Sequence, residues 1–362
     1  MSWLHSVIRA RRGYADQPRF LTYLVTFRCN ARCVMCDSWR KAPVQELSLP
    51  AIEQIFRQLP RLDAVRLSGG EPFLRRDLRE IADLATEHLR PRLLHITSNG
   101  FLTEQIVRFC ETRNRALPLM LLLSLDGVGE KHDTVRGIPG AWEKAMRTLH
   151  ALTTRRKELN LRLAVNQTIV DAEGCAQYRA LREVLTPLAV PHHVVIAYDQ
   201  SATYSTTETS EMAPHLAGAF PTFGELPPEQ LQALFADFAA DVNRYAPLER
   251  LAKHYYYRGI RNRLFHHRDI PNPPCVALSS HLRLYPNGDV PVCQFNSTRL
   301  GNLAEQPFAE LWHSERARTL RAWIARCPGC WAECEVLPNA IYSGDILREV
   351  PAMLLGGGMK EY

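Results

Sequence analysis

Residues 19–36 read RFLTYLVTFRCNARCVMC, and this stretch decides how the chain folds. An apolar run ends at Thr26, and three cysteines follow it with the spacing Cys29-x3-Cys33-x2-Cys36. Such a run is typical of a buried strand, so the pattern predicts a strand that leads into a thiolate-rich loop. Thiolates are the usual ligands of iron–sulfur clusters, and three of them leave one iron of a cubane open.

Structural zinc is the alternative occupant of this loop. A closed zinc site uses four ligands, whereas no further cysteine or histidine lies between Cys36 and His88. The missing fourth ligand favours the cluster.

From Arg19 to Tyr198, short apolar runs alternate with longer segments that have helical periodicity. This alternation predicts an α/β fold with a parallel sheet built from βαβ units. Right-handed crossovers place the loops that follow the strands on one common face. Candidate helix starts lie at Ser48, at Asp77 with Glu80 as a capping box, and at Thr103. The six predicted strands are Arg19–Thr26, Ala64–Leu67, Arg92–Thr97, Pro118–Ser124, Leu161–Thr168 and His192–Tyr198.

Polar and glycine-rich motifs follow three of the later strands. Paired glycines let the backbone approach a ligand, a carboxylate beside them can accept hydrogen bonds from an ammonium group, and an arginine can pair with a carboxylate. Turn and capping chemistry explains Asn99 and Asp126 equally well. The motifs are Ser68-Gly69-Gly70-Glu71-Pro72, Thr97-Ser98-Asn99-Gly100 and Ser124-Leu125-Asp126-Gly127, with His132-Asp133 and Arg136-Gly137 beyond the last.

A second group of cysteines lies near the other end of the chain. A predicted hairpin, with its turn at 286–289, separates Cys275 from Cys293, and Cys327-x2-Cys330-x3-Cys334 follows a helix predicted over Phe308–Ile324. Five thiolates are one more than a four-ligand site needs. Either an iron–sulfur cluster or a zinc ribbon would accept four of them.

The cysteine loop after the first strand, with Gly-Gly-Glu-Pro one βα unit later, resembles the radical S-adenosylmethionine (SAM) superfamily. The resemblance implies a partial (β/α)6 TIM-like barrel that binds a [4Fe–4S] cluster through the three cysteines. It implies that Gly69, Gly70 and Glu71 hold the methionyl amine of SAM. It also implies that Ser124 and Arg136 contact SAM, with Asn99 and Asp126 as further candidates. Asn166 and Thr168 of the fifth strand fit the same layer, or are ordinary strand residues. Met35 stands where the family usually has an aromatic residue.

The C-terminal cysteines resemble the SPASM and twitch domains of such enzymes. This resemblance implies a small α+β domain with one auxiliary [4Fe–4S] cluster, held by Cys275, Cys293, Cys327 and Cys330, with Cys334 competing. Sulfatase-maturing relatives carry an aspartate as proton acceptor where this chain has Gln294. A base could instead come from Asp199 or Tyr198.

We therefore expect five segments. They are an N-terminal extension (1–18), a radical SAM barrel (19–200), a helical linker region (201–270), an auxiliary cluster domain (271–345) and a tail (346–362). The linker region holds amphipathic helices over Pro227–Tyr245 and Leu248–His267, and its tract from His254 to Arg268 could pack or bind a polar ligand.

The composition limits the kinds of binding partner and the cellular location that we expect for this protein. The net charge is +6, but the 44 basic and 38 acidic residues are scattered, which argues against a nucleic-acid surface. The longest apolar stretch, Ala116–Leu125, is too short to cross a bilayer, and Met1–Arg12 lacks the features of a signal peptide. We expect that N-terminal stretch to form a helix on the domain, with a membrane-surface helix as the alternative, and we expect a cytoplasmic enzyme.

Three functions remain open. The leading one is a radical SAM oxidoreductase that takes electrons from a flavodoxin or ferredoxin and abstracts hydrogen from a peptide or sugar-like substrate. The second is a protein or peptide maturase, of the sulfatase type or the type that modifies ribosomally made peptides. The third is a non-catalytic zinc or iron–sulfur binding protein.

Overall fold

A parallel sheet of seven strands forms the centre of the computed structural model, which describes residues 17–210 and 216–349. The spatial order is β6-β5-β4-β3-β2-β1-β7, so the first six strands lie side by side in chain order. Each pairs in parallel with the next, as crossover units require. The strands are β1 (Phe20–Thr26), β2 (Ala64–Gly69), β3 (Leu93–Ser98), β4 (Leu119–Ser124), β5 (Leu161–Ile169), β6 (His192–Ile196) and β7 (His281–Leu284).

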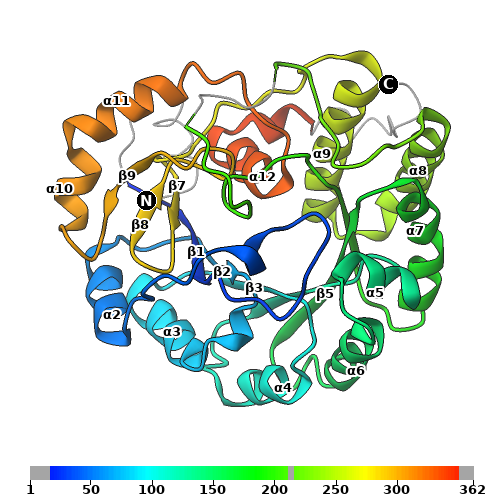
Figure 1. Cartoon of the computed structure of the whole chain (residues 1–362), viewed down its shortest axis with the longest axis horizontal. Coiled ribbons are helices and arrows are strands. Elements are labelled where there is room, and N and C mark those ends of the chain that lie inside the picture. Colours follow the sequence, from blue (N-terminus) through cyan, green and yellow to red (C-terminus); the bar gives the residue numbers. More distant parts are fainter. Residues whose placement is uncertain (1–16, 211–215, 350–362) are drawn as a thin grey trace.

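Helices cover the outer face of this curved sheet (Figure 1). On β2, Val65 and Leu67 are fully buried under them, while Arg66 between them faces the barrel interior and stays partly exposed. Tyr23 of β1 packs edge-on against Phe56 of the first helix in the same way. The covering helices are α2 (Leu49–Gln58), α3 (Leu78–Leu84), α4 (Thr103–Thr112), α5 (Glu130–Arg136), α6 (Ala141–Thr153) and α7 (Ala172–Leu185).

The six predicted strands are confirmed within two residues at each end, and the partial barrel with them. The start of α2 is also as predicted, because the Ser48 hydroxyl accepts a hydrogen bond from the Ala51 N–H. The capping box at Asp77 is wrong, since that carboxylate accepts from the Arg75 guanidinium instead. Thr103 is the first residue inside α4, and its hydroxyl bonds to that of Thr148.

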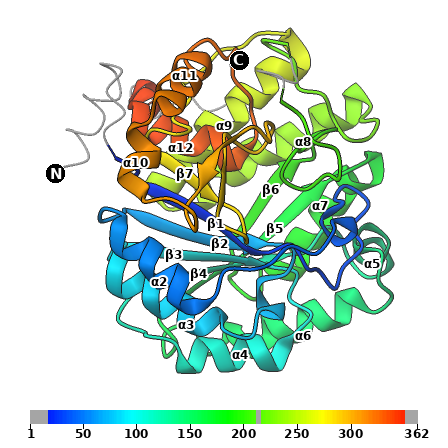
Figure 2. The ribbon, with the colours of Figure 1, turned by 60° about the vertical axis from the view of Figure 1, so that its left-hand side comes forward.

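The predicted hairpin between Cys275 and Cys293 is only partly correct. The turn exists, with the Tyr285 N–H donating to the Asp289 carbonyl, but the strands on its two sides belong to different sheets. One side is β7, which joins the main sheet beside β1 (Figure 2). The other is β8 (Asp289–Pro291), which pairs antiparallel with β9 (Arg299–Asn302). The C-terminal region is therefore built directly onto the barrel edge.

Two helices predicted for the linker region are present as α8 (Pro228–Asp241) and α9 (Pro247–His266). The tract that begins at His254 is a packing helix, since Tyr255, Tyr256 and Tyr257 are all buried. Trp331 stacks against Tyr255 with ring centroids 5.7 Å apart. A side chain at Gly259 would collide with the Trp331 ring. This contact fixes the Cys327–Cys334 segment against α9.

The C-terminal helices differ from the prediction. The single helix expected over Phe308–Ile324 is two helices, α10 (Phe308–His313) and α11 (Glu315–Ile324), because Ser314 caps the second through the Ala317 N–H. Helix α12 (Glu333–Ser343) was not predicted. Short helical turns occupy Ser38–Arg40, Pro72–Leu74, Ala85–Leu89, Val242–Arg244 and Asp345–Glu349.

Two expectations fall outside the described residues, namely the helix over Met1–Arg12 and all but the first four residues of the tail (346–362). Across residues 17–210 and 216–349, none of the helices has both the length and the apolar content needed to cross a bilayer.

Candidate functional site

The three N-terminal cysteines lie in one loop at the end of β1, all as free thiols. Burial raises the pKa of Cys29 to about 12 and that of Cys36 to about 11, and the other thiols of the loop add to both shifts. The Ala31 N–H donates to the Cys29 sulfur at 3.4 Å, and the Ser38 N–H to the Cys36 sulfur at 3.5 Å. Backbone donors of this kind surround thiolates bound to iron. The donor set therefore fits an iron–sulfur cluster.

Backbone hydrogen bonds hold this loop against the end of α5. The Arg32 N–H donates to the Arg136 carbonyl at 2.8 Å, and the Val34 N–H to the Val135 carbonyl at 3.0 Å. Gly137 ends α5 in the left-handed conformation, and a Cβ there would lie 2.4 Å from the Arg32 carbonyl oxygen. The arginine–glycine motif is thus placed beside the cysteines.

The two glycines at the end of β2 pack on the backbone that leads to Cys29. A Cβ on Gly69 would lie 2.1 Å from the Thr26 carbonyl oxygen, and one on Gly70 would lie 2.2 Å from that of Arg28. The N–H groups of Gly70 and Glu71 donate to these same carbonyls, each at 2.8 Å. Only glycine permits this approach, so the motif and the cysteine loop form one rigid unit.

Glu71 is buried, and its carboxylate accepts three hydrogen bonds from the protein. The donors are the Ser98 hydroxyl (2.9 Å), the Phe73 N–H (3.1 Å) and the Asn99 N–H (2.8 Å). Burial raises the pKa of Glu71 to about 7, although these donors oppose the shift. A carboxylate has about four acceptor positions, so one stays available to a ligand. The side chain mainly ties the end of β2 to that of β3.

A buried ion pair joins the next two motifs. The Arg136 Nε lies 2.7 Å from a carboxylate oxygen of Asp126, and an Nη of the same guanidinium lies 3.5 Å from the Cys33 sulfur. The other Asp126 oxygen accepts from the Thr168 N–H at 2.9 Å. Because Asp126 and Cys33 raise the pKa of Arg136 despite its burial, the guanidinium is a fixed cation beside the cluster loop.

The remaining strand-end residues divide into two groups. Asn99 is engaged internally, since its amide donates to the Asn30 side chain at 2.7 Å and its oxygen accepts from the Phe101 N–H. Ser124 lies opposite Asn166 in the β4–β5 register. Neither of these two side chains hydrogen-bonds to another described residue.

Four of the five C-terminal cysteines come together. Cys275 is partly exposed, and the charges of Cys293 and Cys327 add to the desolvation that raises its pKa. Cys293 and Cys275 likewise contribute to the raised pKa of Cys330.

Cys334 is the fifth cysteine of this region. Its thiol bonds to the Gln294 side chain oxygen, and its nearby charged groups are Glu335, Arg283, Arg66 and Glu333. Burial raises its pKa to about 11. Cys334 thus lies next to charged groups of β2, β7 and α12.

Two features between the cysteine groups were not anticipated. The first is Tyr204, whose hydroxyl bonds to Ser68. Burial raises the pKa of Tyr204, and the charges of Cys334 and Cys36 add to the shift, so this side chain lies near one cysteine of each group. Arg283 forms a buried ion pair with Glu335, whose second oxygen lies 3.3 Å from His281. No local motif marks these residues, because the barrel closure brings them together from distant segments.

Tyr198 and Asp199 were the two candidate general bases from the sequence, and the structure gives them different surroundings. The Tyr198 hydroxyl accepts a hydrogen bond from the Trp331 N–H at 2.6 Å, and Asp199 is exposed. Tyr198 therefore supports the segment that carries Cys330.

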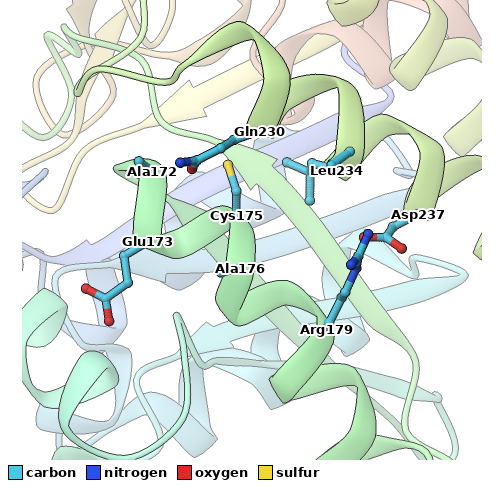
Figure 3. A pocket seen from close by; sticks show the side chains of 9 residues that line it. Ala172, Glu173, Cys175, Ala176, Arg179, Gln230, Leu234 and Asp237 are labelled. Atoms are coloured by element: carbon cyan, nitrogen blue, oxygen red, sulfur yellow. The ribbon is translucent and has the colours of Figure 1, made fainter.

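A separate pocket of 440 Å³ lies between α7 and α8 (Figure 3). Cys175 points into it, and Arg179 pairs with Asp237 at 2.6 Å along its wall. None of the site residues expected from the sequence lines this pocket.

Within the described ranges, no three histidine, cysteine, aspartate or glutamate side chains converge closely enough to hold a single metal ion. A cubane cluster spaces its thiolates over separate irons, so its ligands lie further apart than those of one ion.

Two family models match the chain. The model of the radical SAM superfamily matches residues 23–165, and that of an iron–sulfur cluster-binding domain, SPASM, matches residues 275–334. The two matches cover the two cysteine groups.

The curated relatives that match the chain include enzymes named as synthases and enzymes named as maturases. The chain is 28% identical to an AdoMet-dependent heme synthase of Methanosarcina barkeri, over 95% of this chain and 99% of that protein. An Fe-coproporphyrin III synthase of the same organism is 30% identical over 50% of this chain, and the mycofactocin maturase MftC of Mycolicibacterium smegmatis is 33% identical over 38%. The chain spans only 45% and 35% of these last two proteins.

Among solved structures, SuiB of Streptococcus suis bound to its precursor peptide SuiA has a TM-score of 0.60 at 13% identity. The match covers 90% of this chain and 75% of SuiB, and it concerns the fold alone.

Proposed function

Because the chain is a radical SAM enzyme with a C-terminal iron–sulfur cluster-binding domain, we propose that it abstracts hydrogen from a carboxylate-bearing tetrapyrrole in a reaction of the heme synthase type. The observation that carries this substrate class is the full-length correspondence with the heme synthase, 99% of that protein. The SAM-cleaving part rests on the rigid unit of cysteine loop, glycine pair and Arg136.

In this proposal Cys29, Cys33 and Cys36 hold a [4Fe–4S] cluster. When bound, the cluster delivers one electron that splits SAM into methionine and a 5′-deoxyadenosyl radical, which takes a hydrogen atom from the substrate and becomes 5′-deoxyadenosine. The chain itself positions SAM and excludes water around it.

The SAM contacts are assigned by chemistry and location. The Gly69–Gly70 backbone and the remaining acceptor position of Glu71 suit the methionyl amine, and Arg136 suits the carboxylate. Ser124 offers its hydroxyl to SAM. Asn99 and Asp126 are positioning residues, because their polar groups are bonded to Asn30, Thr168 and Arg136.

The C-terminal domain is proposed to hold one auxiliary cluster. Cys275, Cys293, Cys327 and Cys330 are its ligands in this assignment, since their charges act on one another. Cys334 is left as a free thiol beside Gln294.

A peptide substrate is the second candidate, as in a maturase. The 33% identity to MftC over the barrel half of the chain favours it. The sugar-like substrate expected from the sequence stays a prediction.

We further infer the cellular compartment of the enzyme, its electron donor and its division into segments. All ten cysteines are free, which suits a reducing compartment such as the cytoplasm, where a flavodoxin or ferredoxin would supply electrons. The segments 19–200, 201–270 and 271–345 are proposed as barrel, linker region and cluster domain.

The experiment is anaerobic incubation of the reconstituted enzyme with dithionite, SAM and iron coproporphyrin III, a tetracarboxylate. We expect 5′-deoxyadenosine above the level formed without substrate, and a porphyrin product of altered mass. A porphyrin recovered unchanged, while a peptide substrate is converted, would favour the second candidate.

A further inference from the structure

One row of polar residues crosses the inner face of the barrel. In the strand register Thr22 of β1 lies opposite Arg283 of β7 on one side and Arg66 of β2 on the other, and Arg66 lies opposite His95 of β3. Residues opposite each other in a sheet point to the same face. The row therefore places two arginines and a histidine on the barrel floor.

The interior position of Arg66 and His95 follows from the alternation of burial. On β2 and β3 the intervening residues Val65, Leu67, Leu94 and Ile96 are at most 2% exposed, whereas Arg66 and His95 are partly exposed. The apolar set packs under the helices, so the other set faces the interior.

The two arginines differ in how their charge is balanced. The Arg283 guanidinium is paired with Glu335, which also interacts with His281. Arg66 has no carboxylate partner among residues 17–210 and 216–349. Its Nε–H donates to the His95 Nδ1 at 3.2 Å, and burial and the Arg66 charge both lower the pKa of His95, so this imidazole is neutral. Within the described residues Arg66 is thus a cation without a carboxylate partner, and the Cys334 thiol and His281 are the other titratable groups on which its charge acts.

Two other buried arginines of this protein use their terminal nitrogens to bond to the protein itself. The terminal nitrogens of Arg113 donate to four backbone carbonyls, and Arg75 donates to two carbonyls and to Asp77. These side chains act as internal braces. The terminal nitrogens of Arg66 have no described acceptor, so the role of a brace does not explain them.

The guanidinium of Arg66 is nevertheless held in place. The His95 nitrogen fixes its Nε, and the Phe20 ring lies under it with 5.3 Å between the guanidinium carbon and the ring centroid. Both contacts leave the two terminal nitrogens free. Such a fixed pair of N–H donors matches the two oxygens of a carboxylate.

The location relates this cation to the SAM site. Arg66 precedes Gly69 by three residues on the same strand, a rise of roughly 10 Å. A group bound at Arg66 would thus lie roughly 10 Å along β2 from the glycines proposed to hold the methionyl amine of SAM. Only a substrate long enough to span that distance could occupy both places, as a tetrapyrrole with propionate side chains would.

We propose that Arg66 binds a carboxylate of the substrate inside the barrel and thereby sets which carbon faces SAM. The inference deepens the proposed function and rests on its substrate class. Arg66 is on this account a binding residue that takes no part in the cleavage of SAM.

The test compares iron coproporphyrin III with its tetramethyl ester, which has the same ring but no charge on its side chains. Dissociation constants come from absorption titrations of the reconstituted enzyme and of its Arg66→Gln, Arg66→Lys and Arg108→Gln variants. Arg108 is an exposed residue of α4 and serves as the matched control.

We expect the wild type and the Arg108→Gln variant to bind the acid about 10- to 100-fold more tightly than the ester. Arg66→Gln should remove most of that preference, and Arg66→Lys should restore part of it, because lysine keeps the charge without the planar fork. Circular dichroism spectra and iron content that match those of the wild type would show that both Arg66 variants fold.

An unchanged acid-over-ester preference in Arg66→Gln would overturn the assignment of Arg66 while leaving the proposed function intact. A wild type that cleaves SAM but binds neither porphyrin would overturn the proposed substrate class, and the assignment with it.

Discussion

The Arg136 guanidinium lies 2.7 Å from the Asp126 carboxylate, and both side chains are buried next to Cys33. This pair connects the end of β4 to the end of α5, which in turn carries the backbone of the cysteine loop. The site is therefore braced by the protein before any ligand is present.

Breaking this pair should destabilise the protein. Asp126→Asn leaves a buried arginine without its counter-charge, which costs about 3–5 kcal/mol. Urea unfolding of the metal-free protein measures the change. Glu158→Gln is the control, because it removes one of the two carboxylate partners of Arg155 at the surface and should have little effect. Equal effects of the two substitutions would contradict the role given to the buried pair.

The glycine pair should not tolerate a methyl group. Gly70→Ala places a Cβ against the Arg28 carbonyl, so the cysteine loop must move, and we expect SAM cleavage to fall about 100-fold. The matched control is Gly174→Ala in α7. Its Cβ would lie 3.4 Å from the nearest atom, Cγ2 of Ile169, so this variant should keep full activity. Production of 5′-deoxyadenosine is the measurement, and similar rates in both variants would show that the close approach is unimportant.

The auxiliary ligand set can be tested by iron content. Cys330→Ser should lose about four irons from a total of about eight per chain, whereas Cys334→Ser should keep all of them. Iron and sulfide analysis after anaerobic reconstitution distinguishes the two. Loss of iron in Cys334→Ser with retention in Cys330→Ser would reverse the assignment.

The buried Glu71 predicts a dependence of stability on pH. Its pKa in the folded protein is raised to about 7 from 4.5, so between these values the folded state holds a proton that the unfolded state has lost. Its contribution is therefore fully present below pH 4.5 and is lost as the pH rises to about 7.

Urea unfolding of the metal-free wild type and of Glu71→Gln at several pH values measures this contribution. The stability of the wild type relative to the variant should increase as the pH is lowered from 7 to 4.5. A difference that stays constant over this range would mean that Glu71 titrates normally.

Much of the barrel could be predicted from the sequence because its strands and helices follow one another locally. The apolar run before Cys29 and the glycine pair before Glu71 both have periodic or motif signals of their own. The position of β7 had no such signal, since it pairs with β1 across roughly 260 residues of chain, as in the contact of Phe20 with His281. Helix α12 was hidden by its cysteine and by Pro338.

The candidate site was predictable to a similar degree. The Cys29–Cys36 loop lies beside the glycine pair and the end of α5, as the order of these motifs suggested. The bond of the Cys334 thiol to Gln294, 40 residues away, had no local signal. Arg66 looked like an ordinary strand residue, because what distinguishes it is the lack of a partner in three dimensions. Spacing in a sequence cannot report that.

The most direct test of the central claim is the cleavage of SAM by the anaerobically reconstituted and reduced protein. We predict that the wild type forms 5′-deoxyadenosine and methionine, and that Cys33→Ala forms neither while keeping the iron of its C-terminal site. Undiminished 5′-deoxyadenosine formation by Cys33→Ala would contradict the account.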